Sequence, residues 1–153
     1  MAERDHSWHC FRTSALERST LRRAQAGRST SLVRGAGRGG DAFVGCPTAS
    51  AEIYDPATGR FSLVGSLANA SLDPQAALLR DGRVLIVGGW NLGGQGLASA
   101  EVFDPTTDTF SPTGSMSAAR RFCTAASLAD GQVLVVGGDI STGFLASAEV
   151  YAP

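Results

Sequence analysis

Three glutamates occupy one position of a recurring seven-residue segment, and carboxylates are residues that could perform acid–base chemistry. Glu52 lies in Ser-Ala-Glu-Ile-Tyr-Asp-Pro, and Glu101 and Glu149 lie in close copies of that segment, 49 and then 48 residues further on. General acid–base catalysis needs its groups placed around one reacting atom. Because these glutamates recur on successive units, we expect each one to have a structural role, pairing with a backbone or arginine group between units, and we expect no catalytic residue among them.

Two motifs near the N-terminus could bind a cofactor or a metal. Residues 35–40 fit the G-x-G-x-x-G pattern of dinucleotide sites, but such a site needs a strand before it and a helix after it, and residues 41–47 would not form a helix. His6, His9 and Cys10 are metal-ligating types, although no second cluster completes a set of four ligands. We therefore expect no cofactor and no metal site.

Arginine is concentrated near the N-terminus. Residues 1–40 hold eight of the 13 arginines with three acidic residues, whereas residues 41–153 hold five arginines with 11 acidic residues, and the chain has no lysine. No aromatic or helical periodicity organises the arginines, so we expect no nucleic-acid partner. The apolar runs are too short to span a bilayer, and the three cysteines, at unrelated repeat positions, do not indicate a disulfide framework.

One complete unit, residues 67–115, shows the elements that must position these residues. Four short strands are expected in it, at residues 75–79, 84–87, 99–103 and 109–111. Asp81-Gly82 favours a tight hairpin turn, and Asp104 begins a second turn. Residues 84–87 form a short apolar run, which predicts a strand buried on both faces.

The same order returns in the neighbouring units. A glycine pair follows each apolar strand position at a spacing of 49 residues; the pairs are Gly39-Gly40, Gly88-Gly89 and Gly137-Gly138. The later unit predicts strands at residues 124–128 and 133–136 and a third strand ending at Val150. The earlier unit predicts strands at residues 52–54 and 61–63, joined by a turn that Asp55 begins. A period near fifty indicates a repeat architecture whose units pack on one another.

These features resemble the Kelch repeat family. The resemblance rests on the apolar strand ending in Gly-Gly, the Glu-aliphatic-aromatic-Asp-Pro segment, and a later aromatic residue at Phe61 or Phe110. It implies an all-β fold, an incomplete Kelch-type β-propeller of about two to three four-stranded antiparallel blades. Arg120 fits the family's pattern near the first strand, while Pro74 and Cys123 stand where the family often has a histidine.

The units divide the chain into a basic N-terminal segment, residues 1–38, and a Kelch region, residues 39–153. The region comprises a partial blade, a full blade and an incomplete blade, at residues 39–66, 67–115 and 116–153. The segment 1–38 reads either as a disordered tail or as partly out-of-frame translation. Since propellers close with about 4–8 blades, we expect a fragment of a longer propeller or a truncated gene product, with self-association through open blade edges as a third reading.

The loops between the second and third strands and those between blades emerge on one face of such a fold. The binding candidates on that face are Trp90, Asn91, Asp139, Phe144, Arg120 and Arg121. Loops that vary on a constant scaffold are typical of recognition surfaces, and tryptophan and arginine are enriched in hot spots. The sequence therefore predicts a noncatalytic module that binds a protein or a carbohydrate. The alternatives are a piece of a copper oxidase-like Kelch enzyme whose catalytic residues lie elsewhere, and a nonfunctional gene fragment.

Overall fold

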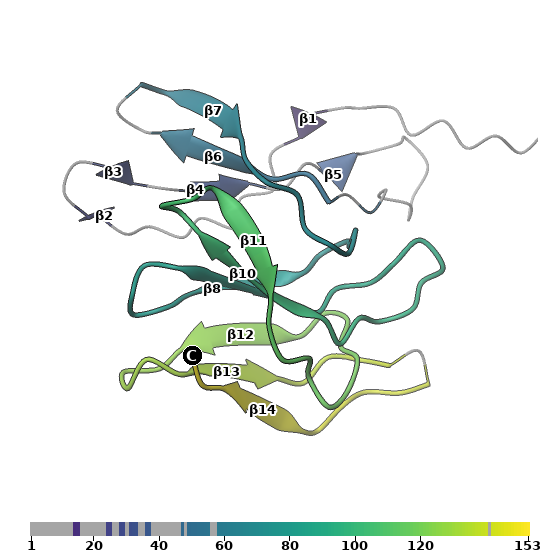
Figure 1. Cartoon of the computed structure of the whole chain (residues 1–153). Coiled ribbons are helices and arrows are strands. Elements are labelled where there is room, and N and C mark those ends of the chain that lie inside the picture. Colours follow the sequence, from purple (N-terminus) through teal and green to yellow (C-terminus); the bar gives the residue numbers. More distant parts are fainter. Residues whose placement is uncertain are drawn as a thin grey trace, which may run out of the picture.

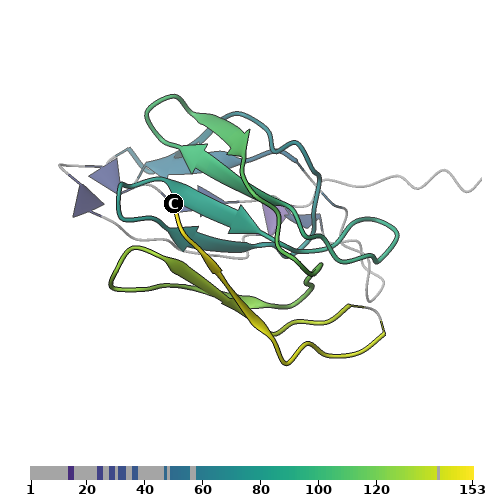
Figure 2. The ribbon, with the colours of Figure 1, turned by 60° about the horizontal axis from the view of Figure 1, so that its bottom comes forward.

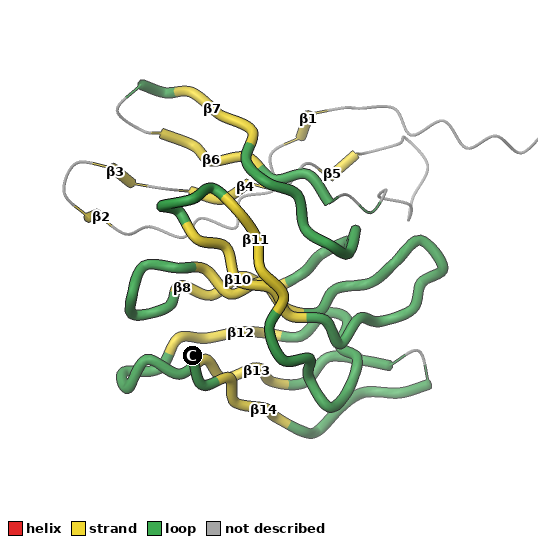
Figure 3. Tube along the Cα trace, in the orientation of Figure 1, coloured by secondary structure: helices red, strands yellow, loops and turns green. Residues whose placement is uncertain are grey.

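The computed structural model describes Pro47, residues 49–55, 58–140 and 142–153, and the backbone of five short strands nearer the N-terminus. Those strands are β1 (Ser14–Ala15), β2 (Ala24–Gln25), β3 (Arg28–Ser29), β4 (Ser31–Val33) and β5 (Ala36–Gly37). His6, His9, Cys10 and Gly39-Gly40, on which predictions fell, lie outside the described residues. The described part of the chain is strand and loop, and it contains no helix long and apolar enough to cross a membrane (Figure 3).

The central sheet has four antiparallel strands that neighbour one another in chain order. They are β8 (Gln75–Leu78), β9 (Val84–Val87), β10 (Ala100–Asp104) and β11 (Thr109–Pro112). Leu85 on β9 faces Ala77 on β8 and Val102 on β10. The all-β fold class and the meander expected for residues 67–115 are confirmed.

A second sheet repeats this arrangement in the next unit. It contains β12 (Thr124–Ser127), β13 (Val133–Val136) and β14 (Ala148–Tyr151) in that order. Val135 faces Ala125 on β12 and Glu149 on β14. The strands β9 and β13 therefore belong to separate sheets, as separate repeat units require.

The remaining three-stranded sheet belongs to the earlier unit and has the order β4, β6 (Glu52–Asp55) and β7 (Arg60–Leu63). The backbone of β4 pairs with β6 as β9 pairs with β10, because Leu32 faces Ile53. The paired strand thus begins at Ser31, before residues 35–38, where the repeat spacing placed it. Two-stranded ribbons form between β1 and β5 and between β2 and β3. The domain boundary after residue 38 stays a prediction.

The three sheets stack on one another, as the two views show (Figures 1 and 2). All four residues of β9 are buried, and alternate residues belong to different core clusters. Leu85 and Val87 pack with Val133 and Val135 of the next sheet, whereas the neighbouring residues of β9 pack with Ala51 of the earlier unit. Strand β9 is therefore buried on both faces, and the apolar contacts between consecutive sheets hold the units together.

The connections divide the stack into two ends (Figure 1). Tight hairpins at residues 79–83 and 128–132 form one end. The loops after the glycine pairs and the linkers between sheets form the other end, which we call the loop face. It comprises residues 64–74, 88–99, 113–123 and 137–147.

Candidate binding face

Arg120 lies beneath the loop face and is fully buried, with 0% of its surface exposed. Its Nε and Nη2 donate to Oε1 of Glu149 at 3.2 and 3.0 Å. Its Nη1 donates to the carbonyl oxygens of Gly137 and Ser147 at 2.7 and 3.0 Å, and Nη2 also donates to the Ser147 hydroxyl at 2.8 Å. These five bonds match the five N–H donors of a guanidinium.

The prediction that Arg120 contacts a partner is wrong. A residue with no exposed surface and five internal hydrogen bonds has nothing left to present to a ligand. Its side chain instead ties the linker before β12 to the start of β14, and so fixes the base of the loop after the second glycine pair.

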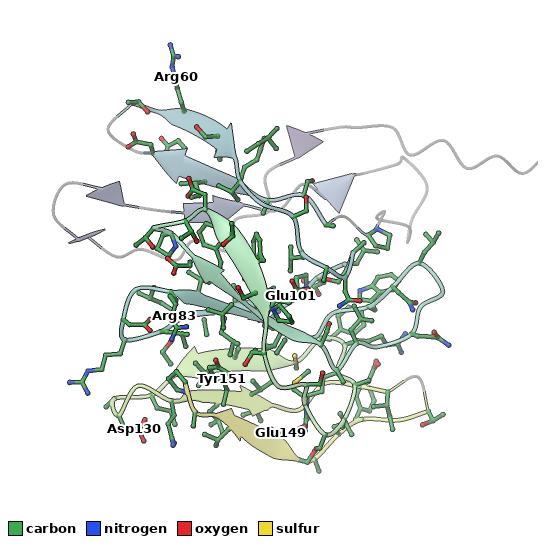
Figure 4. The ribbon with its side chains drawn as sticks, in the orientation of Figure 1. Arg60, Arg83, Glu101, Asp130, Glu149 and Tyr151 are labelled. Atoms are coloured by element: carbon green, nitrogen blue, oxygen red, sulfur yellow. The ribbon has the colours of Figure 1, made fainter. Side chains whose placement is uncertain are left out.

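The repeated glutamates attach each linker to its own sheet. Glu101 is buried and accepts hydrogen bonds from the amides of Ala68 and Asn69 at 2.9 and 3.3 Å. Glu149 accepts from the amides of Ser117 and Ala118 at 2.6 and 3.3 Å. Figure 4 shows the two glutamates on neighbouring sheets, with Arg83 and Asp130 towards the hairpin end. These carboxylates do not converge on one point, and Glu52 lies on β6 opposite Leu63.

Electrostatics favour the ionised form of Glu149. Burial alone would raise the pKa of its carboxyl, but the Ser117 amide, the Arg120 guanidinium and the Ala118 amide together hold that pKa below its ordinary value of 4.5. The carboxylate therefore remains charged and keeps its hydrogen bonds at neutral pH.

The glycine pairs let the chain pass directly under the linkers. Gly88 and Gly89 have φ of +66° and +87°, and Gly137 and Gly138 have φ of +65° and +95°. A Cβ atom on Gly138 would lie 2.5 Å from the carbonyl oxygen of Arg121. Both the positive φ and this close approach require glycine. The glycine pairs thus position the loops that follow them.

Arg121 and Asp139 meet on the loop face. Their backbones exchange two hydrogen bonds, and Nε of Arg121 donates to a carboxylate oxygen of Asp139. Nη1 of Arg121 also donates to the carbonyl oxygen of Gly94 at 2.7 Å, which links the loop of the central sheet to that of the next. The structure therefore brings together two predicted binding residues as an ion pair that is about four-fifths buried.

An aromatic cluster lies beside this ion pair. The rings of Trp90 and Phe122 lie 6.3 Å apart, and the guanidinium of Arg121 lies 5.9 Å from the Phe122 ring centre. Trp90 Nε1 is buried and has no hydrogen-bond acceptor among the described residues. Phe122 is 58% exposed. The cluster of Trp90, Arg121, Phe122 and Asp139 is called the aromatic shelf below.

Two other predicted residues have different surroundings. Asn91 bonds to Gln95 through both its side-chain amide and its side-chain carbonyl, which holds the loop after β9 in shape. Phe144 is 93% exposed and lies next to Asp139 in a short backbone bridge. Asp104 accepts from the amide and hydroxyl of Thr106 and stabilises the turn before β11, and Asp55 accepts through its carbonyl oxygen from Gly59 in the matching turn.

Sequence reasoning missed Phe122. Its exposure depends on a backbone φ of +53°, which no sequence pattern of the local segment reveals. A signal was nevertheless present in the repeat. Asp73 stands 49 residues earlier, at the equivalent position, and aspartate is a residue type that tolerates positive φ.

Residues 75–117 match the Kelch motif. The chain carries Kelch repeats. The matched residues contain the whole central sheet, which is therefore a Kelch blade. Among curated proteins, none matches the sequence.

A solved structure supports the same fold. A fungal alcohol oxidase of the AA5 family, solved in complex with copper, aligns with a TM-score of 0.58 and 21% identity. The alignment covers 81% of this chain and 26% of that chain. Identity this low shows the fold alone, so the described sheets are part of a Kelch-type propeller arrangement.

The residues of the Kelch region do not fit the copper that the oxidase binds. Copper favours imidazole and thiolate ligands in a converging set. Residues 41–153 contain no histidine, and the described part of the chain holds no group of three residues with suitable side chains. Tyr54 and Tyr151 occupy the repeat's own aromatic position, where Tyr54 packs on Phe61 at 4.9 Å.

Proposed function

We propose that this Kelch region is a noncatalytic binding module that contacts its partner through the loop face. The proposal is supported by the aromatic shelf, which places an exposed aromatic ring beside a buried ion pair on loops that differ between the repeats. Loop residues on a rigid scaffold are the usual location of recognition sites.

The scaffold under these loops is rigid for identifiable reasons. Arg120 fixes the start of β14 to the preceding linker, and Gly138 brings the loop after β13 beneath Arg121. Arg121 then joins that loop to Gly94 in the neighbouring blade. A preorganised surface of this kind loses little conformational entropy when a partner binds.

The test is to display the purified chain to two libraries, one of random linear peptides and one of neutral oligosaccharides. Ligands that bind are then tested against an alanine variant at Trp90, which lies on the loop face, and against a Leu128→Ala variant at the hairpin end. The proposal predicts loss of binding with the first variant and unchanged binding with the second. Ligands that depend on Leu128 alone, or the absence of any ligand, would contradict it.

A further inference from the structure

Phe122 has a backbone conformation that a phenylalanine adopts at a cost. Its φ of +53° places it in the left-handed region, which is uncommon for residues other than glycine, asparagine and aspartate and is an outlier for a bulky side chain. Asp73 has a φ of +47° at the same position of the preceding blade. The linker therefore imposes this conformation on whichever residue stands there.

The side chain of Phe122 gains little from folding in return. It is 58% exposed and belongs to neither of the core clusters among the described residues. Its contacts are with the Trp90 ring and the Arg121 guanidinium. A strained, exposed aromatic residue that does not stabilise the core points to a role in binding.

The rest of the shelf indicates what kind of partner fits. Most polar side chains around Phe122 already bond to one another or to backbone, since Arg121 pairs with Asp139 and Gly94 and Asn91 pairs with Gln95. The charges of Arg121 and Asp139 cancel, so the surface offers no net charge to a ligand. The buried Trp90 Nε1 is a donor that lacks an acceptor within the described residues.

We propose that Phe122 is the anchor of a docking surface for an uncharged, apolar segment of another protein, an inference that rests on the proposed function. An apolar side chain of that segment packs on the Phe122 ring, because aromatic residues supply large contact areas at interfaces. A backbone carbonyl of the segment supplies the acceptor that Trp90 Nε1 lacks. A carbohydrate fits less well, because its hydroxyl groups need several polar side chains that are not already paired.

Two substitutions separate binding from stability. Phe122→Asn removes the ring and places a residue that tolerates positive φ, so it should raise the Tm of the free chain by about 3 °C. Trp90→Phe removes the unpaired N–H and keeps most of the ring. Leu63→Asn is the matched control, because Leu63 is 75% exposed on β7, away from the loop face.

The experiment measures the Tm of each variant and its affinity for peptides selected from a random linear peptide library against the wild-type chain. The selected peptides should be rich in apolar residues. We expect Phe122→Asn to weaken their binding about 30-fold and Trp90→Phe to weaken it about fivefold. Leu63→Asn should leave the affinity unchanged. Higher stability together with weaker binding is a combination that a purely structural residue would not give.

Other outcomes overturn the inference in distinguishable ways. Peptides that bind Phe122→Asn as tightly as the wild type would show that Phe122 is not the anchor. Selection of oligosaccharides and not peptides, with binding still lost in Trp90→Ala, would refute the protein segment and leave the loop-face module standing. If neither library yields a ligand, both the anchor and the proposed function fail.

Discussion

The guanidinium of Arg120 and the carboxylate of Glu149 lie 3.0 Å apart, and both side chains also bond to backbone groups around them. The arginine comes from the linker before β12, and the glutamate comes from β14, 29 residues later. This pair closes the blade at its loop end, so the surface above it depends on a contact inside the protein. At the equivalent position of the central blade the chain has Ser71, which is also buried.

Replacement of Arg120 by methionine should lower the free energy of unfolding by about 3 kcal/mol, because it leaves Glu149 and two buried carbonyl groups without their partner. Arg121→Met is the control, since that side chain is partly exposed and its loss should cost about 1 kcal/mol or less. Urea denaturation of the two variants measures the difference. Equal losses would contradict the assignment of Arg120 as the internal clamp.

The stability of the chain should fall in acid as Glu149 takes up a proton. Its folded pKa lies below the ordinary value of 4.5, so the stabilisation is present above that value and is lost as the pH falls through the folded pKa. Thermal unfolding between neutral and acidic pH should show a stability gap between the wild type and Glu149→Gln that narrows as the pH falls. A gap that is constant with pH would refute this role.

Alanine at Gly138 should destabilise the chain more than alanine at Gly94. Both glycines have positive φ, of +95° and +74°, but a Cβ atom on Gly138 meets the Arg121 carbonyl, whereas one on Gly94 meets no atom within 4 Å. The conformational cost alone is about 1 kcal/mol, and the clash adds to it at Gly138. Matching Tm values for the two variants would show that the close approach is unimportant.

Cys123 should resist thiol reagents while the chain is folded. Its side chain is 4% exposed, and burial raises the pKa of its thiol above the ordinary value of 9.0, which disfavours the reactive thiolate. In a chain with Cys10 and Cys46 changed to serine, labelling in native buffer should be at least about 100-fold slower than in urea. Labelling at similar rates in both conditions would mean that the core around Cys123 opens readily.

The strands could be predicted because their signals are local. The run at residues 84–87 with Asp81-Gly82 before it and Gly88-Gly89 after it sets both ends of β9, and the same signals recur at β13. Repetition also made the stacking predictable, since a unit of this size buries its apolar faces only against its neighbours.

The roles of the loop residues were harder to predict because they depend on contacts between distant segments. Arg120 and Arg121 are adjacent arginines in one linker, yet one is buried and the other is partly exposed. The difference arises from Glu149 and Asp139, which reach them from other elements. The conformation of Phe122 is likewise imposed by the linker, so only the comparison with Asp73 could have drawn attention to it.

Hydrogen exchange of the free and peptide-bound chain tests the loop face most directly. With a peptide from the selected library bound, the account predicts slower amide exchange in residues 88–99, 117–123 and 137–147 and unchanged exchange in the hairpins at residues 79–83 and 128–132. Protection confined to the hairpins, where a pocket of about 290 Å³ lies between Leu78 and Leu128, would contradict it.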